Sequence, residues 1–120
     1  EGKPLVVYGG SDFRTSLCFV SDMVNGIVRL MHTDSDPGPV NLGSDEEQDI
    51  DEVAQKIIDM THSSSKIIFE SPILFMRPQP IPNITRAREE LGWFPVIRLE
   101  DGLKEMIEYT QAQKSLLGVK

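Results

Sequence analysis

The spacing of apolar residues changes once within the stretch from Phe13 to Met31. Apolar and polar side chains alternate over 13–20, which is the period of a β-strand. From Ser21 onward apolar residues recur at helical spacing, and Ser21 stands where a helix cap is expected, with Asp22 in the first turn. We therefore predict a strand over 13–20 and a helix over 21–32. The expected buried face of this helix is Val20, Val24, Ile27, Val28 and Met31.

The same reasoning predicts the other elements of the chain. Gly9 and Gly10 begin a predicted turn over 9–12, and Asp49 and Asn83 are expected to cap the helices that follow them. Gly92 is expected to end the third helix, and Trp93 to pack the turn that follows against the body. The predicted strands span 5–8, 40–42 and 66–70, and the further helices span 50–62, 84–91 and 99–114.

Residues 71–83 form a proline-rich segment that is incompatible with a helix. It holds Pro72, Pro78, Pro80 and Pro82, and Arg77 is its one charged residue. We expect an extended surface loop here, and loops of this length often carry function.

Composition narrows the classes of function. The chain has 120 residues, which corresponds to one domain or a piece of one, and its net charge is −7 from 19 acidic and 12 basic residues. This balance and the absence of Lys or Arg runs argue against nucleic-acid binding, and no apolar run is long enough for a membrane span. No secretory signal precedes the first strand and Cys18 is the single cysteine, so we expect a cytoplasmic protein with Cys18 as a small buried residue.

Motifs for a complete catalytic centre are missing. The sequence has no GxGxxG, P-loop, CxxC or HExxH motif, and neither Tyr8 nor Tyr109 is followed by lysine four residues later. The acidic run over 45–47 lacks the alternating spacing of a calcium loop, so a solvated loop is the better interpretation. We predict no catalytic residue, no cofactor-binding residue and no metal ligand within these residues.

Three blocks of sequence, in this order, resemble a known family. They are VVYGG with RTSLCFVSDMVNGIVRLM, then PVNLGSDEE, then IPNITRAREELGWFPVIRLEDGLKEMIEY. Together they are similar to the C-terminal part of the extended short-chain dehydrogenases/reductases, most of all to UDP-glucuronate decarboxylases, the UDP-xylose synthases. The resemblance covers nearly the whole chain.

The resemblance implies an α/β fold: the C-terminal substrate-binding part of an enzyme whose NAD(P)-binding Rossmann core is largely missing from this chain. Residues 1–120 would be a nucleotide-sugar-binding domain and a fragment of a longer enzyme. NAD, held by the N-terminal domain, would oxidise C4 of the glucuronosyl ring, the β-keto acid would lose carbon dioxide, and the same NADH would reduce the ketone. The full-length enzyme would be a homodimer that binds a UDP-sugar.

The resemblance also implies that Arg14, Tyr8 and Arg77 bind the substrate. Relatives usually read QTRSF where this chain reads FRTSL, so the arginine that contacts the diphosphate stands one place earlier here, at Arg14. In a regular strand such a shift turns the side chain to the opposite face, although a bulge could restore it. Relatives often read RKPDI where this chain reads PIPNI, which puts Pro80 in place of an arginine, and Arg77 is the expected substitute.

Two alternatives stay open at this point. A nucleotide-sugar 4,6-dehydratase or 4-epimerase would share the same blocks, since the residues that separate these activities lie mostly in the N-terminal domain. A non-catalytic module derived from this fold is the other alternative, which the changes at 14 and 80 favour.

Overall fold

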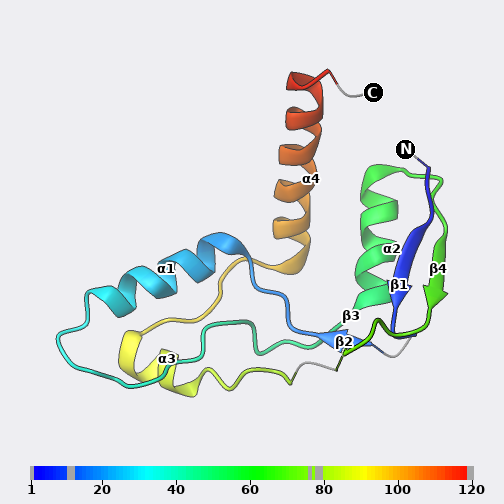
Figure 1. Cartoon of the computed structure of the whole chain (residues 1–120). Coiled ribbons are helices and arrows are strands. Elements are labelled where there is room, and N and C mark those ends of the chain that lie inside the picture. Colours follow the sequence, from blue (N-terminus) through cyan, green and yellow to red (C-terminus); the bar gives the residue numbers. More distant parts are fainter. Residues whose placement is uncertain (1, 11–12, 76, 78–79, 119–120) are drawn as a thin grey trace.

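A computed structural model describes residues 2–10, 13–75, 77 and 80–118 of the chain (Figure 1). Ser11 and Asp12 of the predicted turn, and Pro78 of the proline-rich segment, lie outside the described residues. The strands are β1 (Leu5–Tyr8), β2 (Arg14–Thr15), β3 (Gln48–Asp49) and β4 (Ile67–Glu70). The helices are α1 (Val20–Met31), α2 (Ile50–Thr61), α3 (Thr85–Leu91) and α4 (Leu99–Leu116).

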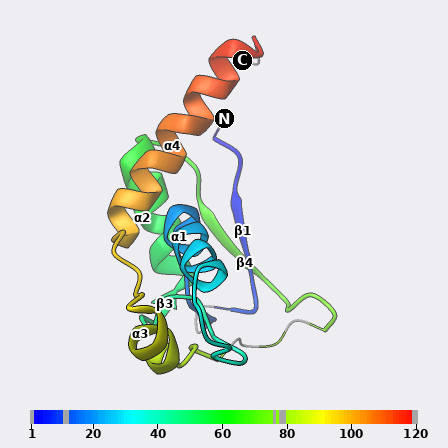
Figure 2. The same cartoon turned by 90° about the vertical axis from the view of Figure 1, so that its left-hand side faces the viewer.

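β1 and β4 form a two-stranded parallel sheet with α2 packed against it (Figures 1 and 2). Leu5 pairs with Ile67 and Tyr8 with Glu70, so both strands end at the same edge of the sheet. Val7 of β1 and Val53 and Ala54 of α2 are buried, which makes a small apolar core on this side of the molecule. The predicted strands at 5–8 and 66–70 are thus confirmed, the second beginning one residue later than expected.

The predicted strand over 13–20 is wrong beyond its first residues. Within this range the ladder holds Arg14 and Thr15, which pair antiparallel with the two residues of β3. Beyond this ladder the Ser16 hydroxyl donates a hydrogen bond to the Ser44 carbonyl, 2.6 Å away. A strand needs a partner for its backbone groups, and among the described residues no strand lies opposite 16–20.

Helix α1 was predicted at the correct place but with the wrong buried face. It begins at Val20, after Phe19, and no side chain caps it, so Ser21 is not its cap. Its buried residues are Asp22 and Gly26, and a Cβ atom at Gly26 would lie 3.0 Å or less from Leu42 and Trp93. The predicted apolar face points away from this contact, and its five residues are 45% to 75% exposed.

The main core surrounds Trp93, which is 1% exposed. Ile84 and Ala87 of the α3 region are buried beside it, and Cys18 and Leu42 pack against this group. The indole Nε1 of Trp93 donates a hydrogen bond to the Asp22 carbonyl at 2.9 Å, so the ring's polar atom is satisfied inside the core. The predicted packing role of Trp93 is confirmed.

The caps of the other helices follow the sequence in part. Gly92 ends α3 in the left-handed conformation at φ 58°, as predicted. Asn83 is not the cap residue of α3, which is Ile84, although its side chain accepts a hydrogen bond from the Thr85 backbone N–H at 3.0 Å. Asp49 precedes α2 but caps no N–H with its side chain, because that carboxylate pairs with Arg14. Residues 40–42 were predicted as a strand and form none, although Leu42 packs on the core.

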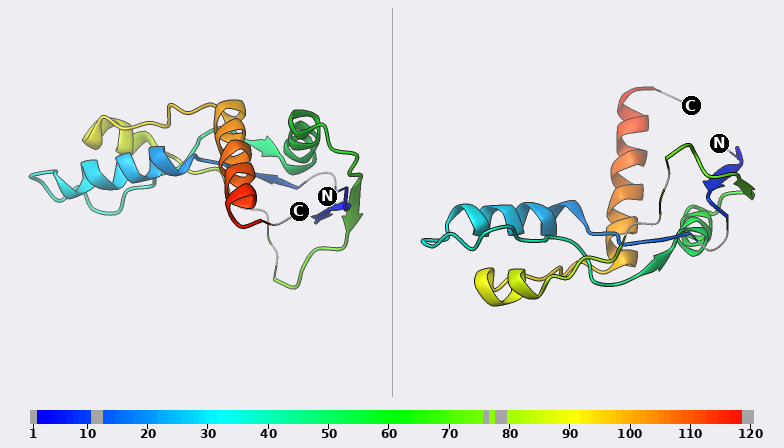
Figure 3. Two further views of the ribbon diagram at one scale, coloured as in Figure 1. Left: turned by 90° about the horizontal axis from the view of Figure 1, so that it is seen from above. Right: turned by 60° about the horizontal axis from the view of Figure 1, so that its bottom comes forward.

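The molecule is elongated rather than compact. Its extents are 51 × 35 × 22 Å and its radius of gyration is 17.2 Å, where a compact chain of this length has about 14 Å. Figure 3 shows α1 and α4 running in different directions from the point where they meet, with α2 on the far side of α4. None of the described helices has the length and hydropathy of a bilayer span. Because the chain is elongated, it leaves the apolar face of α1 uncovered.

Replacement of Trp93 by alanine should remove the centre of the main core. We expect the free energy of unfolding to fall by about 3–5 kcal/mol, the usual cost of deleting a fully buried large aromatic ring. Chemical denaturation monitored by circular dichroism measures this loss. The neighbouring Phe94, which is 53% exposed, is the matched control, and Phe94→Ala should cost far less. Equal losses for the two variants would contradict the assigned core.

Candidate functional site

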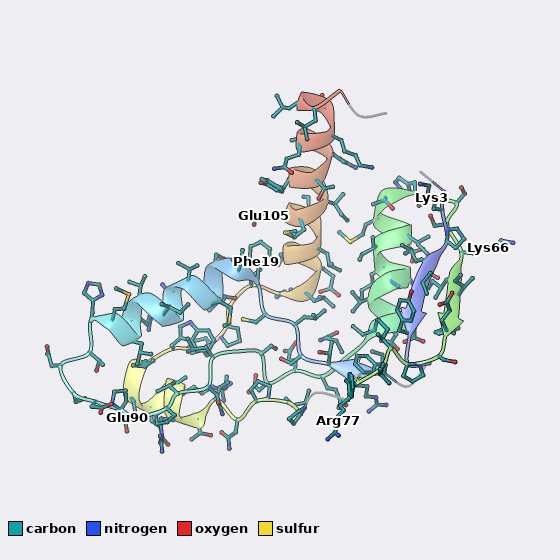
Figure 4. The ribbon with its side chains drawn as sticks, viewed as in Figure 1. Lys3, Phe19, Lys66, Arg77, Glu90 and Glu105 are labelled. Atoms are coloured by element: carbon teal, nitrogen blue, oxygen red, sulfur yellow. The ribbon has the colours of Figure 1, made fainter. Side chains whose placement is uncertain are left out.

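Two of the three residues predicted to bind substrate lie where β1 ends and β2 follows. Tyr8 is the last residue of β1, and Arg14 opens β2. Arg77 belongs to the segment after β4, which leaves the same edge of the sheet as β1 does. In the view of Figure 4, Arg77 lies below the β2–β3 ladder. The topology thus directs all three segments to one end of the sheet, while the described contacts join none of the three side chains to another.

Arg14 is held by two carboxylates from the segment that contains β3. Its Nη1 atom lies 2.9 Å from Oε2 of Glu47, and its Nε atom lies 2.8 Å from Oδ1 of Asp49. Asp49 is the direct ladder partner of Arg14. The guanidinium remains accessible, because the Arg14 side chain is 57% exposed.

These contacts keep Arg14 charged and oriented. The hydrogen bond to Glu47 and the negative charge of Asp49 raise the pKa of the Arg14 guanidinium above its ordinary value. A planar, permanently charged fork of N–H donors is suited to phosphate oxygens. The local balance is acidic, however, since one cation faces two anions. Anion binding at Arg14 must therefore work against the charge of its own partners.

Tyr8 is half-exposed at the edge of the β1–β4 sheet. It pairs in register with Glu70, and the backbone N–H of Gly9 donates to the Glu70 carbonyl at 3.2 Å. The strand ends there, because Gly9 adopts φ 96°, a conformation that favours glycine. The backbone geometry therefore fixes where the Tyr8 ring leaves the sheet.

A large and mostly apolar cavity lies elsewhere, between α2 and α4. It has a volume of about 820 Å³ and is lined by Leu5, Ile57, Leu103 and Ile107 among others, but not by Tyr8, Arg14 or Arg77. Lys56 and Glu100 bridge α2 and α4 with an ion pair of 2.6 Å. That ion pair lowers the pKa of the Glu100 carboxyl. The apolar lining of this cavity fits packing against another protein domain better than binding of a charged ligand.

A second, polar cavity of about 400 Å³ lies beside the loop over 44–48. Arg88 of α3 and Arg98 line it, and Arg88 forms an ion pair with Asp45 at 2.9 Å. Like Arg14, Arg88 is half-exposed and already paired with an acid of this loop. Among the described residues, no group of three or more His, Cys, Asp and Glu side chains could hold a metal ion.

Sequence reasoning missed the partners of Arg14. It assigned the acidic run to solvent and Asp49 to a helix cap, whereas Glu47 and Asp49 bind Arg14 and Asp45 binds Arg88. Glu47 lies 33 residues from Arg14, so only the pairing of β2 with β3 brings them together. The alternation of acids at 47 and 49, just before a predicted helix, is the one signal that could have indicated the pair.

Comparison with known proteins finds relatives but no matching family model. Over 91% of its length the chain is 40% identical to UDP-glucuronic acid decarboxylase 1 of Danio rerio, covering 26% of that protein. It is 36% identical, over 91% of its length, to a UDP-N-acetyl-alpha-D-glucosaminuronate decarboxylase of Bacillus cytotoxicus, covering 36% of it. The chain thus spans about a quarter to a third of the curated relatives it matches.

Solved structures support the same fold. The UDP-glucose 4-epimerase of Thermotoga maritima, solved with UDP-glucose, superposes with a TM-score of 0.86 at 22% identity. That match covers 93% of this chain and 36% of the epimerase. The UDP-glucuronic acid 4-epimerase of Bacillus cereus, solved with UDP-glucuronic acid and NAD, has a TM-score of 0.83 at 20% identity and covers 92% and 36%.

Cys18 should react slowly with alkylating agents. Burial, aided by the negative charge of Asp22, raises the pKa of the Cys18 thiol, and only the thiolate is nucleophilic. We expect the native protein to be alkylated by iodoacetamide more slowly at neutral pH than the same chain in urea, and its rate to rise at a higher pH. A native rate equal to that in urea across this range would contradict the raised pKa.

Proposed function

We infer that this chain, the C-terminal part of an extended short-chain dehydrogenase/reductase most like the UDP-glucuronic acid decarboxylases, binds the nucleotide-sugar of such an enzyme. The identity of 40% to a UDP-glucuronic acid decarboxylase over nearly the whole chain is the observation that carries this proposal. The reaction proposed for the complete enzyme is conversion of UDP-glucuronate to UDP-xylose.

Arg14 is the residue that we assign to the substrate diphosphate. Its guanidinium is exposed and belongs to β2, the strand that follows β1 and Tyr8 in the chain, and Arg77 lies on the segment after β4. In this proposal Arg14 binds phosphate oxygens through its N–H groups, and Arg77 adds a second positive charge. The ring of Tyr8, at the end of β1, contacts the same substrate.

The uncovered apolar surface is an argument that another protein domain packs on this chain. The apolar face of α1 and the cavity between α2 and α4 are too extensive for a chain that works alone. We propose that the nucleotide-binding domain of the enzyme covers them. That domain would hold NAD, since this chain has no glycine-rich loop, and NAD when bound supplies hydride acceptance and donation at the sugar.

The proposal extends to the assembly and its location. The family resemblance implies a homodimer of the complete enzyme, and the single cysteine fits a cytoplasmic location. Sedimentation analysis and cell fractionation would test these two points separately.

Two other functions keep a specific observation in their favour. The structural likeness to 4-epimerases supports a nucleotide-sugar epimerase or dehydratase, since the same fold carries those activities. The pairing of Arg14 with two carboxylates supports a non-catalytic module, because it opposes anion binding. Product analysis distinguishes an epimerase or dehydratase from a decarboxylase. A non-catalytic module would give no turnover.

Turnover of UDP-glucuronate tests the proposed function directly. The complete polypeptide that carries this chain, incubated with UDP-glucuronate and NAD, should release carbon dioxide and yield UDP-xylose. UDP-galacturonate instead would identify a 4-epimerase. Residues 1–120 alone should neither bind NAD in a calorimetric titration nor turn over substrate. Micromolar NAD binding by this chain alone would show that the cofactor site is misplaced.

Arg14→Ala in the complete protein should weaken UDP binding by about ten-fold, because a charged hydrogen-bond donor to phosphate is lost. Isothermal titration with UDP measures the change. Arg88→Ala is the matched control, since Arg88 is also half-exposed and paired with one acid, and it should leave UDP affinity unchanged. If Arg14→Ala folds normally and binds UDP as the unmodified protein does, the diphosphate contact belongs to Arg77 or to residues outside this chain.

A further inference from the structure

The ion pairs of Arg14 carry a consequence for any anion that binds there. Glu47 and Asp49 contact two different nitrogens of one guanidinium, at 2.9 Å and 2.8 Å. One positive charge thus faces two negative charges, so the cluster as a whole is anionic. The three side chains are 57%, 47% and 31% exposed for Arg14, Glu47 and Asp49, so they are open to solvent and to a ligand.

The geometry of the fork makes the carboxylates direct competitors of a phosphate. Arginine binds an oxyanion in a bidentate manner through the Nε/Nη2 edge or through the Nη1/Nη2 edge. Asp49 occupies Nε and Glu47 occupies Nη1, so each edge includes a nitrogen that already contacts a carboxylate. A diphosphate at either edge must displace one carboxylate or lie close to its negative charge.

The short β2–β3 ladder keeps the competitors in place. Arg14 and Asp49 are direct partners in the antiparallel ladder, and Glu47 stands immediately before β3, two residues ahead of Asp49. Asp49 also leads directly into α2, whose first N–H group, on Ile50, donates to the Phe13 carbonyl at 3.1 Å. The backbone pairing thus holds the acids near Arg14.

We propose that Glu47 and Asp49 set the affinity of the Arg14 site for a diphosphate by competing with it for the guanidinium. This inference rests on the function proposed above, in which Arg14 contacts the diphosphate of a nucleotide-sugar. The two acids are positioning residues that act through Arg14. They favour release of a doubly charged ligand and hold Arg14 in a defined orientation between binding events.

Neutral variants of the two acids test the competition. In the complete protein, Glu47→Gln keeps the shape of the side chain and removes its charge, and UDP should then bind about three-fold tighter or more at low ionic strength. Asp49→Asn should act in the same direction, which provides a second variant if one of them folds poorly. The gain should shrink at high ionic strength, because exposed charges are screened.

Glu46→Gln is the matched control for a general change of charge. Glu46 is exposed and adjacent to Glu47, and its carboxylate takes part in none of the ion pairs found among the described residues. Its replacement should change UDP affinity much less. A second control is the Arg14→Ala background, where Glu47→Gln should have no further effect, since the acid acts through the missing guanidinium.

The outcomes separate this inference from the proposed function. If the unmodified protein binds UDP and both neutral variants bind it equally well or more weakly, the competition is refuted while the function stands. An equal gain from Glu46→Gln, or a gain that persists without Arg14, also refutes it. If the unmodified protein binds no UDP at all, the proposed function fails, and this inference fails with it.

Discussion

The buried Asp22 holds together the part of the molecule that surrounds Trp93. Its carbonyl accepts the indole N–H of Trp93 at 2.9 Å, and its Oδ2 atom accepts the backbone N–H groups of Val96 and Ile97 at 3.0 and 2.9 Å. A carboxylate buried to 5% exposure is costly unless it is hydrogen-bonded, and these donors satisfy it. One residue thus links α1 to the turn after α3 and to the start of α4.

Two close approaches depend on that link. Gly26 of α1 faces Leu42 and Trp93, and Gly102 of α4 faces the ring of Phe19, where a Cβ atom would lie 2.8 Å from the ring. The absence of a side chain at these two positions lets the helix backbones come near the core. Asp22 and the two glycines therefore set the directions of α1 and α4, and so decide which helix faces stay uncovered.

The surroundings of Trp93 and the β2–β3 ladder differ in their packing and electrostatics. Around Trp93 the polar groups are satisfied internally, while α1 and the cavity beside α4 present apolar surface. At the β2–β3 ladder the charges are exposed, and a single arginine is surrounded by acids. A substrate-binding part of a larger enzyme would use both, with the apolar faces joined to another domain and the charged ladder open to ligand.

The sequence by itself determined the positions of the helices and the family. Helical spacing located the four helices of the described residues, Gly92 marked the end of α3, and three ordered blocks pointed to relatives that the comparisons bear out. Helical periodicity and a glycine that ends a helix are local properties, so they can be read without knowledge of the fold.

Only the tertiary structure decided which faces are buried and what Arg14 contacts. The apolar stripe of α1 predicted a buried face, but the chain buries Asp22 and Gly26 instead, because its core lies on that side. Likewise, the length of β2 and the partners of Arg14 depend on pairing with a segment 33 residues away. Periodicity identifies an amphipathic helix or a strand, but not the surface that covers it, because that surface comes from distant parts of the chain or from another body.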